Sequence, residues 1–142
     1  MEIDRKALVR EAFLAGKKAY APYSGFQVGA ALLTGDGSVY GGCNIENASY
    51  GACNCAERTA FFRAVFEGKR EFSAIAIVGK AADAAEYDYC PPCGICRQVM
   101  AEFCDPDSFE IILARSETDY RSYRLGELLP LVFTGSSMED KN

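Results

Sequence analysis

The sequence predicts an α/β fold: a three-layer α/β/α sandwich with a mixed five-stranded sheet, formed by a single domain over residues 1–142. One observation is the order of the indicated elements, in which helices and strands alternate so that one sheet is covered on both faces. A second is the length, because 142 residues suffice for one sizeable core and divide poorly into two. A third is the composition, with 49% hydrophobic and 25% charged residues, which is typical of an ordinary globular protein.

The sequence pattern indicates helices and strands along the whole chain, with no internal repeat or linker. The expected elements are a helix at 4–20, strands at 26–33 and 38–44, a helix at 56–66, a strand at 72–78, a helix at 94–103, strands at 109–114 and 120–124, and a helical turn at 126–129.

The first helix and the hairpin after it follow from local signals. Residues 4–20 are good helix formers with small and apolar side chains at steps of three and four, and Asp4 is a suitable N-cap. The segment 21–25 contains proline and glycine and should end this helix. The apolar run 26–33 then meets the turn sequence GDGS at 35–38, which predicts an antiparallel hairpin.

The middle of the chain begins with a polar loop at 45–54. The segment that follows, 56–66, has helical composition, and Gly68 stands where helices commonly end. The run 72–78 is apolar and β-branched enough for a buried strand.

The last third starts with a loop that contains Pro91 and Pro92. A short helix and a buried strand follow it. The connection 116–119 is too short for a crossover, so the strand at 120–124 should pair antiparallel with the strand before it.

Charge and hydropathy narrow the classes of partner. The formal net charge is −5, so the basic footprint that holds nucleic acid is missing, and a small-molecule substrate is expected instead. No apolar stretch approaches the roughly 20 residues of a membrane span, and the first residues lack a charged and then apolar leader. The sequence therefore predicts a cytoplasmic protein with no membrane contact.

Cysteine and histidine usage points to a metal. Seven cysteines in a chain with an adequate core indicate a metal site or catalysis before disulfides. There is no histidine, which removes Ser-His and Cys-His nucleophilic machinery. Any zinc or iron must therefore be held by thiolates and carboxylates.

Three cysteines stand at predicted helix starts. Cys55 directly precedes one helix, and Cys93 and Cys96 open another, so that their sulfurs can meet where two positive helix ends converge. Three ligands leave a fourth tetrahedral position free for water, the arrangement of a catalytic zinc site. Glu57, in the first helical turn, can move protons to and from that water, as in zinc deaminases with three cysteine ligands and a glutamate that does not bind the metal.

Arg58 is the cation expected next to this centre. Three thiolates and one zinc ion carry a formal charge of about −1, which attracts a guanidinium. Arg58 could also be a solvated helix residue.

The motifs NCAERTA at 54–60 and PCGICRQ at 92–98 resemble the two zinc motifs of the small cytidine deaminases. The segments 21–33, 42–50 and 127–133 are also similar to that family, so the resemblance spans nearly the whole chain. It implies a homotetramer with one zinc ion per chain, and hydrolysis of cytidine and 2′-deoxycytidine to uridine and 2′-deoxyuridine with release of ammonia, a reaction of pyrimidine salvage.

The resemblance also assigns roles to individual residues. It implies that Phe26 packs on the pyrimidine, that Asn44 and Glu46 bind the ribose hydroxyls, that the backbone of Ala56 meets the base, and that Tyr50 and Phe133 reach a site shared between subunits. Without it, Phe26 would be read as core, and Asn44 and Glu46 as surface residues of a turn.

Two features depart from the family pattern. Pro91 stands where the family usually has serine or threonine, although the group used there is a backbone carbonyl, which proline keeps. The loop 80–90 is longer than usual, which leaves the far rim of the pocket and fine substrate preference open.

Other interpretations stay open at this point. Cys90 extends the pattern to C-x2-C-x2-C, so a non-catalytic zinc or iron–sulfur module with Cys90 as fourth ligand is one alternative. A deaminase of a related aminopyrimidine nucleoside, such as an antibiotic nucleoside, is another. Cys43, Cys53 and Cys104 are expected to be small buried or half-buried residues.

Overall fold

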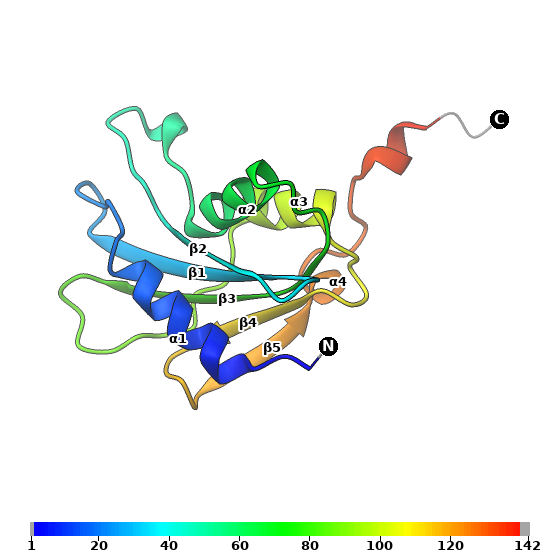
Figure 1. The fold of residues 1–142 in the computed structure, drawn as a ribbon. Coiled ribbons are helices and arrows are strands. Elements are labelled where there is room, and N and C mark those ends of the chain that lie inside the picture. Colours follow the sequence, from blue (N-terminus) through cyan, green and yellow to red (C-terminus); the bar gives the residue numbers. More distant parts are fainter. Residues whose placement is uncertain (1, 140–142) are drawn as a thin grey trace.

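A five-stranded sheet in the order β2-β1-β3-β4-β5 forms the middle layer of the molecule in a computed structural model, which describes residues 2–139 (Figure 1). The elements are α1 (Arg5–Gly16), β1 (Phe26–Thr34), β2 (Val39–Cys43), the 3-10 helix η1 (Tyr50–Ala52), α2 (Ala56–Phe66), β3 (Phe72–Ala81), α3 (Gly94–Phe103), β4 (Glu110–Ala114), β5 (Tyr120–Arg124), α4 (Leu125–Leu128) and the 3-10 helix η2 (Gly135–Met138).

The sheet is mixed, as the sequence predicts. β1 pairs antiparallel with both β2 and β3, β3 pairs parallel with β4, and β4 pairs antiparallel with β5. A parallel pair needs a crossover, and α3 supplies it between β3 and β4. The α/β fold with a mixed five-stranded sheet is thereby confirmed.

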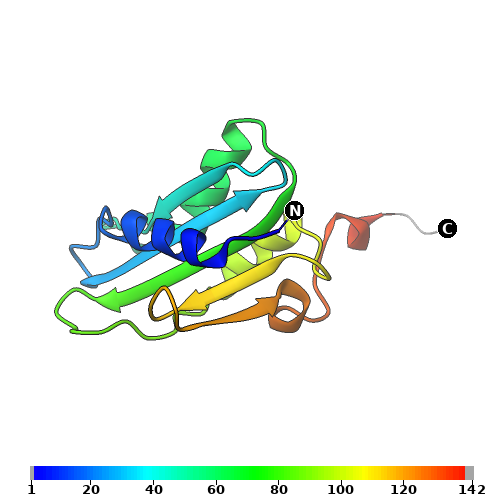
Figure 2. The ribbon, with the colours of Figure 1, turned by 60° about the horizontal axis from the view of Figure 1, so that its bottom comes forward.

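The two faces of the sheet carry separate cores. α1 packs on one face through Leu8, Val9 and Ala12, and Figure 2 shows this helix in front of the sheet. α2 and α3 cover the other face, where Phe61 and Met100 are fully buried. The two helix starts that carry the predicted ligands Cys55 and Cys93 therefore lie on this second face of the sheet.

Two glycines bring helices into direct contact with the sheet. A Cβ at Gly29 would lie 2.1 Å from the Ala12 carbonyl oxygen of α1, and a Cβ at Gly42 would lie 2.4 Å from the Ala56 carbonyl oxygen of α2. Since both contacts are with backbone atoms, no rotamer change can relieve them. The missing side chains thus fix how closely each helix approaches the strands.

Most predicted boundaries hold to within one residue, and the ends of the first helix and of β3 are the exceptions. The first helix ends at Gly16 instead of residue 20, because the Tyr20 N–H donates to the Asn44 carbonyl and the Glu46 N–H donates to the Tyr20 carbonyl. These long-range bonds fasten Tyr20 to the loop after β2, and the chain leaves the α-helix through a turn at 17–18.

β3 is longer than predicted and the polar loop is more ordered than a plain loop. β3 continues to Ala81 rather than residue 78, because Phe26 of β1 still pairs with Ala81 there. In the loop 45–54, Ile45 and Asn54 exchange both backbone hydrogen bonds at 2.9 Å.

No helix within residues 2–139 is long and apolar enough to cross a bilayer.

Candidate active site

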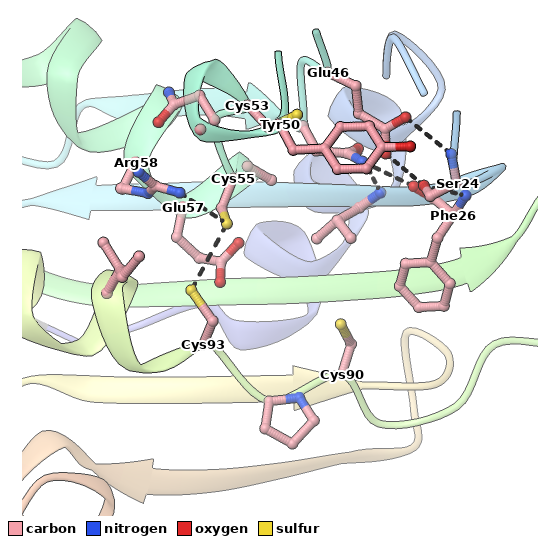
Figure 3. Close-up of a pocket in the computed structure, with 17 residues that line it drawn as sticks. Ser24, Phe26, Glu46, Tyr50, Cys53, Cys55, Glu57, Arg58, Cys90 and Cys93 are labelled. Atoms are coloured by element: carbon pink, nitrogen blue, oxygen red, sulfur yellow. Dashed lines mark hydrogen bonds between the residues drawn. The ribbon is translucent and has the colours of Figure 1, made fainter. Parts of the chain in front are cut away.

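A pocket of about 450 Å³ opens at the N-terminal ends of α2 and α3 (Figure 3). Such a volume is in the range of small-molecule sites. The residues predicted for the site that line this pocket are Phe26, Asn44, Glu46, Tyr50, Cys55, Ala56, Glu57, Arg58 and Cys93.

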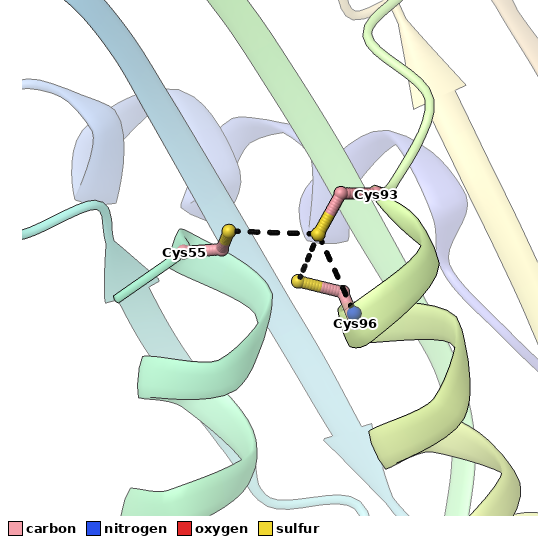
Figure 4. Close-up of side chains that lie close together, drawn as sticks. All are labelled: Cys55, Cys93 and Cys96. Carbon is pink, nitrogen blue, oxygen red and sulfur yellow. Dashed lines mark hydrogen bonds between the residues drawn. The ribbon is translucent and has the colours of Figure 1, made fainter. Parts of the chain in front are cut away.

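Three cysteine sulfurs meet at the inner end of the pocket (Figure 4). Cys55 is the N-cap of α2, Cys93 is the N-cap of α3, and Cys96 lies in the first turn of α3. The sulfurs lie within 4.8 Å of one another, and the cluster is the one group of potential metal ligands of this kind among residues 2–139.

The geometry of this cluster fits a zinc ion. The Sγ atoms of Cys55 and Cys93 are 3.7 Å apart, and those of Cys93 and Cys96 are 3.3 Å apart. Tetrahedral thiolates at a Zn–S distance of about 2.3 Å would be separated by roughly 3.8 Å. The donor set and spacing therefore accommodate zinc with only small adjustments, and three sulfurs leave a fourth position for water.

The surroundings favour negative sulfur at Cys55. A hydrogen bond with Cys96 lowers the pKa of the Cys55 thiol to about 5, and Arg58 acts in the same direction. The Arg58 Nη2 atom lies 3.2 Å from the Cys55 sulfur. The same hydrogen bond between Cys55 and Cys96 raises the pKa of the Cys96 thiol.

Glu57 is the one buried carboxylate of the pocket. Glu57 is only 5% exposed, and burial raises the pKa of its carboxyl group to about 7. Figure 3 shows the carboxylate beside Cys55 and Cys93, pointing into the pocket. A carboxyl group with a pKa near neutrality can both accept and donate a proton.

The opposite end of the pocket is polar. The Glu46 Oε1 atom accepts from the backbone N–H groups of Tyr23 and Ser24, both at 3.0 Å, and Oε2 accepts from the Ser24 hydroxyl. The Asn44 Oδ1 atom accepts from the Val28 N–H at 2.9 Å, and Nδ2 donates to the Phe26 carbonyl at 2.8 Å. These bonds hold both side chains in place, and those from the Ser24 hydroxyl and the Ser24 and Tyr23 N–H groups lower the pKa of Glu46.

Aromatic residues occupy the mouth of the pocket. Phe26 is 40% exposed and Tyr50 is 75% exposed, so both rings present area to the pocket opening. Ala56 is buried at the start of α2. Phe133 does not line the pocket of its own chain; its carbonyl accepts from the Gln98 side chain at 2.7 Å.

The pocket contains further residues that the sequence did not assign to it, among them Ser24, Cys53 and Ile95, while the Pro91 carbonyl was expected there and Cys90 was an open alternative. Cys90, Pro91 and Ile95 form a wall before and within the start of α3, and Ser24 and Cys53 lie near Glu46. Burial raises the pKa of Cys90 to about 11, so its thiol is neutral. Ser24 lies in the turn sequence PYSG, which indicates a helix stop and is part of the resembling segment 21–33, without a role for Ser24 itself.

Comparisons with known proteins agree with this geometry. A family model described as cytidine and deoxycytidylate deaminase zinc-binding region matches residues 2–109. A cytidine deaminase of Halalkalibacterium halodurans is 51% identical over 138 residues, covering 97% of this chain and 100% of the relative. One of Sporosarcina psychrophila is 46% identical over 132 residues, covering 93% of each chain.

A solved structure leads to the same family. The crystal structure of a cytidine deaminase from Burkholderia pseudomallei superposes with a TM-score of 0.83 at 51% identity, covering 92% of this chain and 100% of that one. The match of the family model covers well over half of the sequence. The chain therefore belongs to the cytidine and deoxycytidylate deaminase family.

Proposed function

We propose that this protein hydrolyses cytidine and 2′-deoxycytidine to uridine and 2′-deoxyuridine and releases ammonia. One observation carries the proposal: a buried carboxyl group, Glu57, adjoins a cluster of three cysteines at the closed end of a pocket. The relatives at 46% and 51% identity carry the name cytidine deaminase, which supports the same substrate class.

We further propose that Cys55, Cys93 and Cys96 hold one zinc ion per chain. Zinc, when bound, lowers the pKa of a coordinated water and so supplies the nucleophile at neutral pH. Arg58 donates to the Cys55 sulfur, and its positive charge offsets the negative charge of three thiolates around a divalent ion.

Glu57 moves the protons of the reaction. It accepts a proton from water as the oxygen bonds to C4 of the base, and it delivers that proton to N3. It then takes the proton of the new hydroxyl group and passes it to the amine. The C4–N bond breaks, ammonia leaves, and a C4 carbonyl remains.

The remaining lining residues fit a nucleoside. Phe26 offers an aromatic face to the flat base, and the backbone of Ala56 lies beside it. A carboxylate has about four acceptor positions, and Glu46 uses three of them within the chain, so one is left for a ribose hydroxyl. The Asn44 amide likewise keeps one donor and one acceptor position.

The charges of the pocket favour a nucleoside over a nucleotide. Arg58 is the one cation among the described residues that line it, and Arg58 is bonded to Cys55. Glu46 lies at the sugar end. The described lining residues therefore offer a 5′-phosphate no free cation, which favours a nucleoside over deoxycytidylate.

The closed, four-cysteine alternative finds little support. Cys90 lines the pocket, but its sulfur is not part of the group of donor atoms that lie within 4.8 Å of one another. Three ligands with an open position suit catalysis, whereas a structural site needs a fourth.

We propose that the active form is a homotetramer. Phe133 is 59% exposed and lies outside the pocket of its own chain, while Tyr50 at the pocket mouth is 75% exposed. Aromatic residues are enriched in the cores of protein–protein interfaces, and the resemblance assigns these two residues to a site shared between subunits.

The Glu57→Gln variant tests the proposed chemistry. The amide is nearly isosteric but cannot accept the proton, so turnover of cytidine should fall by about 10⁴-fold, the upper end for proton transfer. Loss of the cytidine absorbance band and ammonia release measure turnover, while metal analysis and equilibrium binding of cytidine check that the site persists. A variant with more than about a tenth of the parental kcat would contradict the role of Glu57.

A further inference from the structure

The segment around Cys90 extends the sheet beside the pocket. β4 pairs with β3 only as far as Leu113 opposite Ile77, and beyond that point Asp88 forms an antiparallel bridge with Gly79 of β3. Asp88 thus takes a place beside β3 that β4 has left, and Cys90 follows two residues later. Cys90 enters the pocket just after this sheet position.

Gly79 provides the space that Cys90 occupies. A Cβ at Gly79 would lie 2.9 Å from the Cys90 sulfur and 3.1 Å from Cε1 of the Phe26 ring. The thiol and the aromatic ring therefore sit side by side over a bare stretch of backbone. Figure 3 shows the Cys90 sulfur pointing into the pocket between Cys93 and Phe26.

Tyr89 fastens this segment to the β4–β5 hairpin. Its hydroxyl donates to Asp119 Oδ1 at 2.5 Å, and the guanidinium groups of Arg115 and Arg121 lie 4.8 Å and 4.4 Å from its ring centroid. Arg115 also forms an ion pair with Asp119. Such a set of contacts on one ring holds the backbone of the next residue, so Cys90 belongs to a fixed wall.

Tyr87 fastens the same loop on the other face of the sheet. Its ring packs edge-on against Phe13 of α1, with centroids 4.7 Å apart, and Lys80 lies over it at 5.3 Å. The loop is therefore held on both faces of the sheet, by Tyr89 on one and Tyr87 on the other. A wall fixed in this way can discriminate by size, because it cannot retreat from a larger ligand.

The proposed chemistry decides which atom of the base faces this wall. C4 must face the three sulfurs, and N3 must face Glu57, which comes from α2. The other ring neighbour of C4 is C5, which must point away from Glu57. On that side the pocket wall is the segment just before α3, which contains Cys90, three residues before Cys93.

We propose that Cys90, seated over Gly79, limits the size of the substituent that the protein accepts at C5 of the pyrimidine. The inference rests on the proposed deaminase function and adds to it a residue that sets substrate range. Cys90 is a positioning and packing residue here and takes no part in the proton transfers.

The test compares kcat/KM for 5-methylcytidine with kcat/KM for cytidine in the zinc-loaded protein. A methyl-sized difference in an apolar pocket changes such a ratio by about 10- to 200-fold. Cys90→Ala should raise the ratio at least about 10-fold because it opens the wall, and Cys90→Val should lower it because valine is bulkier. The two variants give opposite signs, which a general loss of stability would not.

Cys43→Ala is the matched control. Cys43 is another half-buried cysteine, and it lies outside the pocket, where its thiol donates to the Lys18 carbonyl. The control should leave the ratio within about twofold of the parent. Metal content is measured for every variant.

The outcomes separate the inference from the function on which it rests. A parent that deaminates cytidine, with ratios that stay within about twofold in both Cys90 variants, would overturn the inference and leave the function intact. A zinc-loaded parent without cytidine turnover would overturn both.

Discussion

Replacing Gly42 by alanine should disturb the active site from outside it. The new Cβ would lie 2.4 Å from the Ala56 carbonyl oxygen and 2.5 Å from the Ala60 nitrogen of α2. Restoring a separation of about 3.5 Å requires α2 to move by about 1 Å relative to β2. α2 carries Cys55 and Glu57, so their positions relative to Cys93 on α3 would change.

The cost of Gly42→Ala follows from two opposing terms. Overpacking costs about 1–3 kcal/mol, while the loss of glycine from the unfolded chain returns about 0.4–1 kcal/mol. We expect a net loss of about 1–2 kcal/mol in the free energy of unfolding, which at a urea m-value of about 1–3 kcal/mol/M lowers the midpoint by roughly 1 M. A misplacement of about 1 Å can cost about 10²-fold in rate, so kcat should fall more than tenfold.

Gly41→Ala is the control for this prediction. It lies next to Gly42 on the same strand, but its Cβ would point to the other face and meet Ala15 Cβ at an ordinary 3.4 Å. Urea unfolding followed by circular dichroism, with cytidine turnover on the same samples, compares the two variants. Equal midpoints and equal kcat values would refute the argument that backbone contact at Gly42 sets the position of α2.

Three further predictions follow from the site and the fold. Cys93→Ser should lose zinc and Cys90→Ser should keep it, as measured by metal analysis; zinc loss in both would place Cys90 among the ligands. Glu46→Ala should raise KM for cytidine by the equivalent of about 1–3 kcal/mol without loss of zinc, because a hydrogen bond to the ribose disappears; an unchanged KM would show that Glu46 does not touch the sugar. Arg5 binds Glu110 through two hydrogen bonds of 2.6 Å and 2.8 Å and lowers the pKa of that carboxyl group below its ordinary 4.5. The unfolded chain therefore binds the proton first, so this stability is present above about pH 4.5 and is lost as the pH falls through the folded-state pKa. Glu110→Gln should remove about 1 kcal/mol of unfolding free energy at pH 7. Its urea midpoint should also fall less steeply than that of the parent as the pH is lowered; equal slopes in parent and variant would contradict the role of this pair.

Local signals account for the parts of the fold that were predicted correctly. The bounds of α2, α3 and β5 agree with the prediction to the residue. Cys55 and Cys93 are the N-caps of the two helices. Gly68, with a φ of 90°, stands just after α2. The mixed sheet follows from connection lengths. Both kinds of signal are contained in neighbouring residues.

Errors arose where distant segments decide the structure. The helical pattern continues through Ala19, but Tyr20 pairs with the loop after β2, a contact between residues more than 20 positions apart. Cys90 joins the pocket because Asp88, two residues earlier, bridges to Gly79 of β3 beyond the end of β4, which no spacing rule reveals. The roles of the site residues, the homotetramer and the cytoplasmic location stay predictions.

The meeting of two helix ends at three sulfurs has a consequence for folding. Cys55 and Cys93 are 38 residues apart in sequence, so a metal bound to both acts as a reversible cross-link between α2 and α3. The folded chain alone presents the three thiolates together, and zinc at 1,000 times its dissociation constant adds about 4 kcal/mol to stability by mass action. With zinc bound as proposed, the free energy of unfolding, and with it the resistance of the chain to proteolysis, would rise with the free zinc concentration.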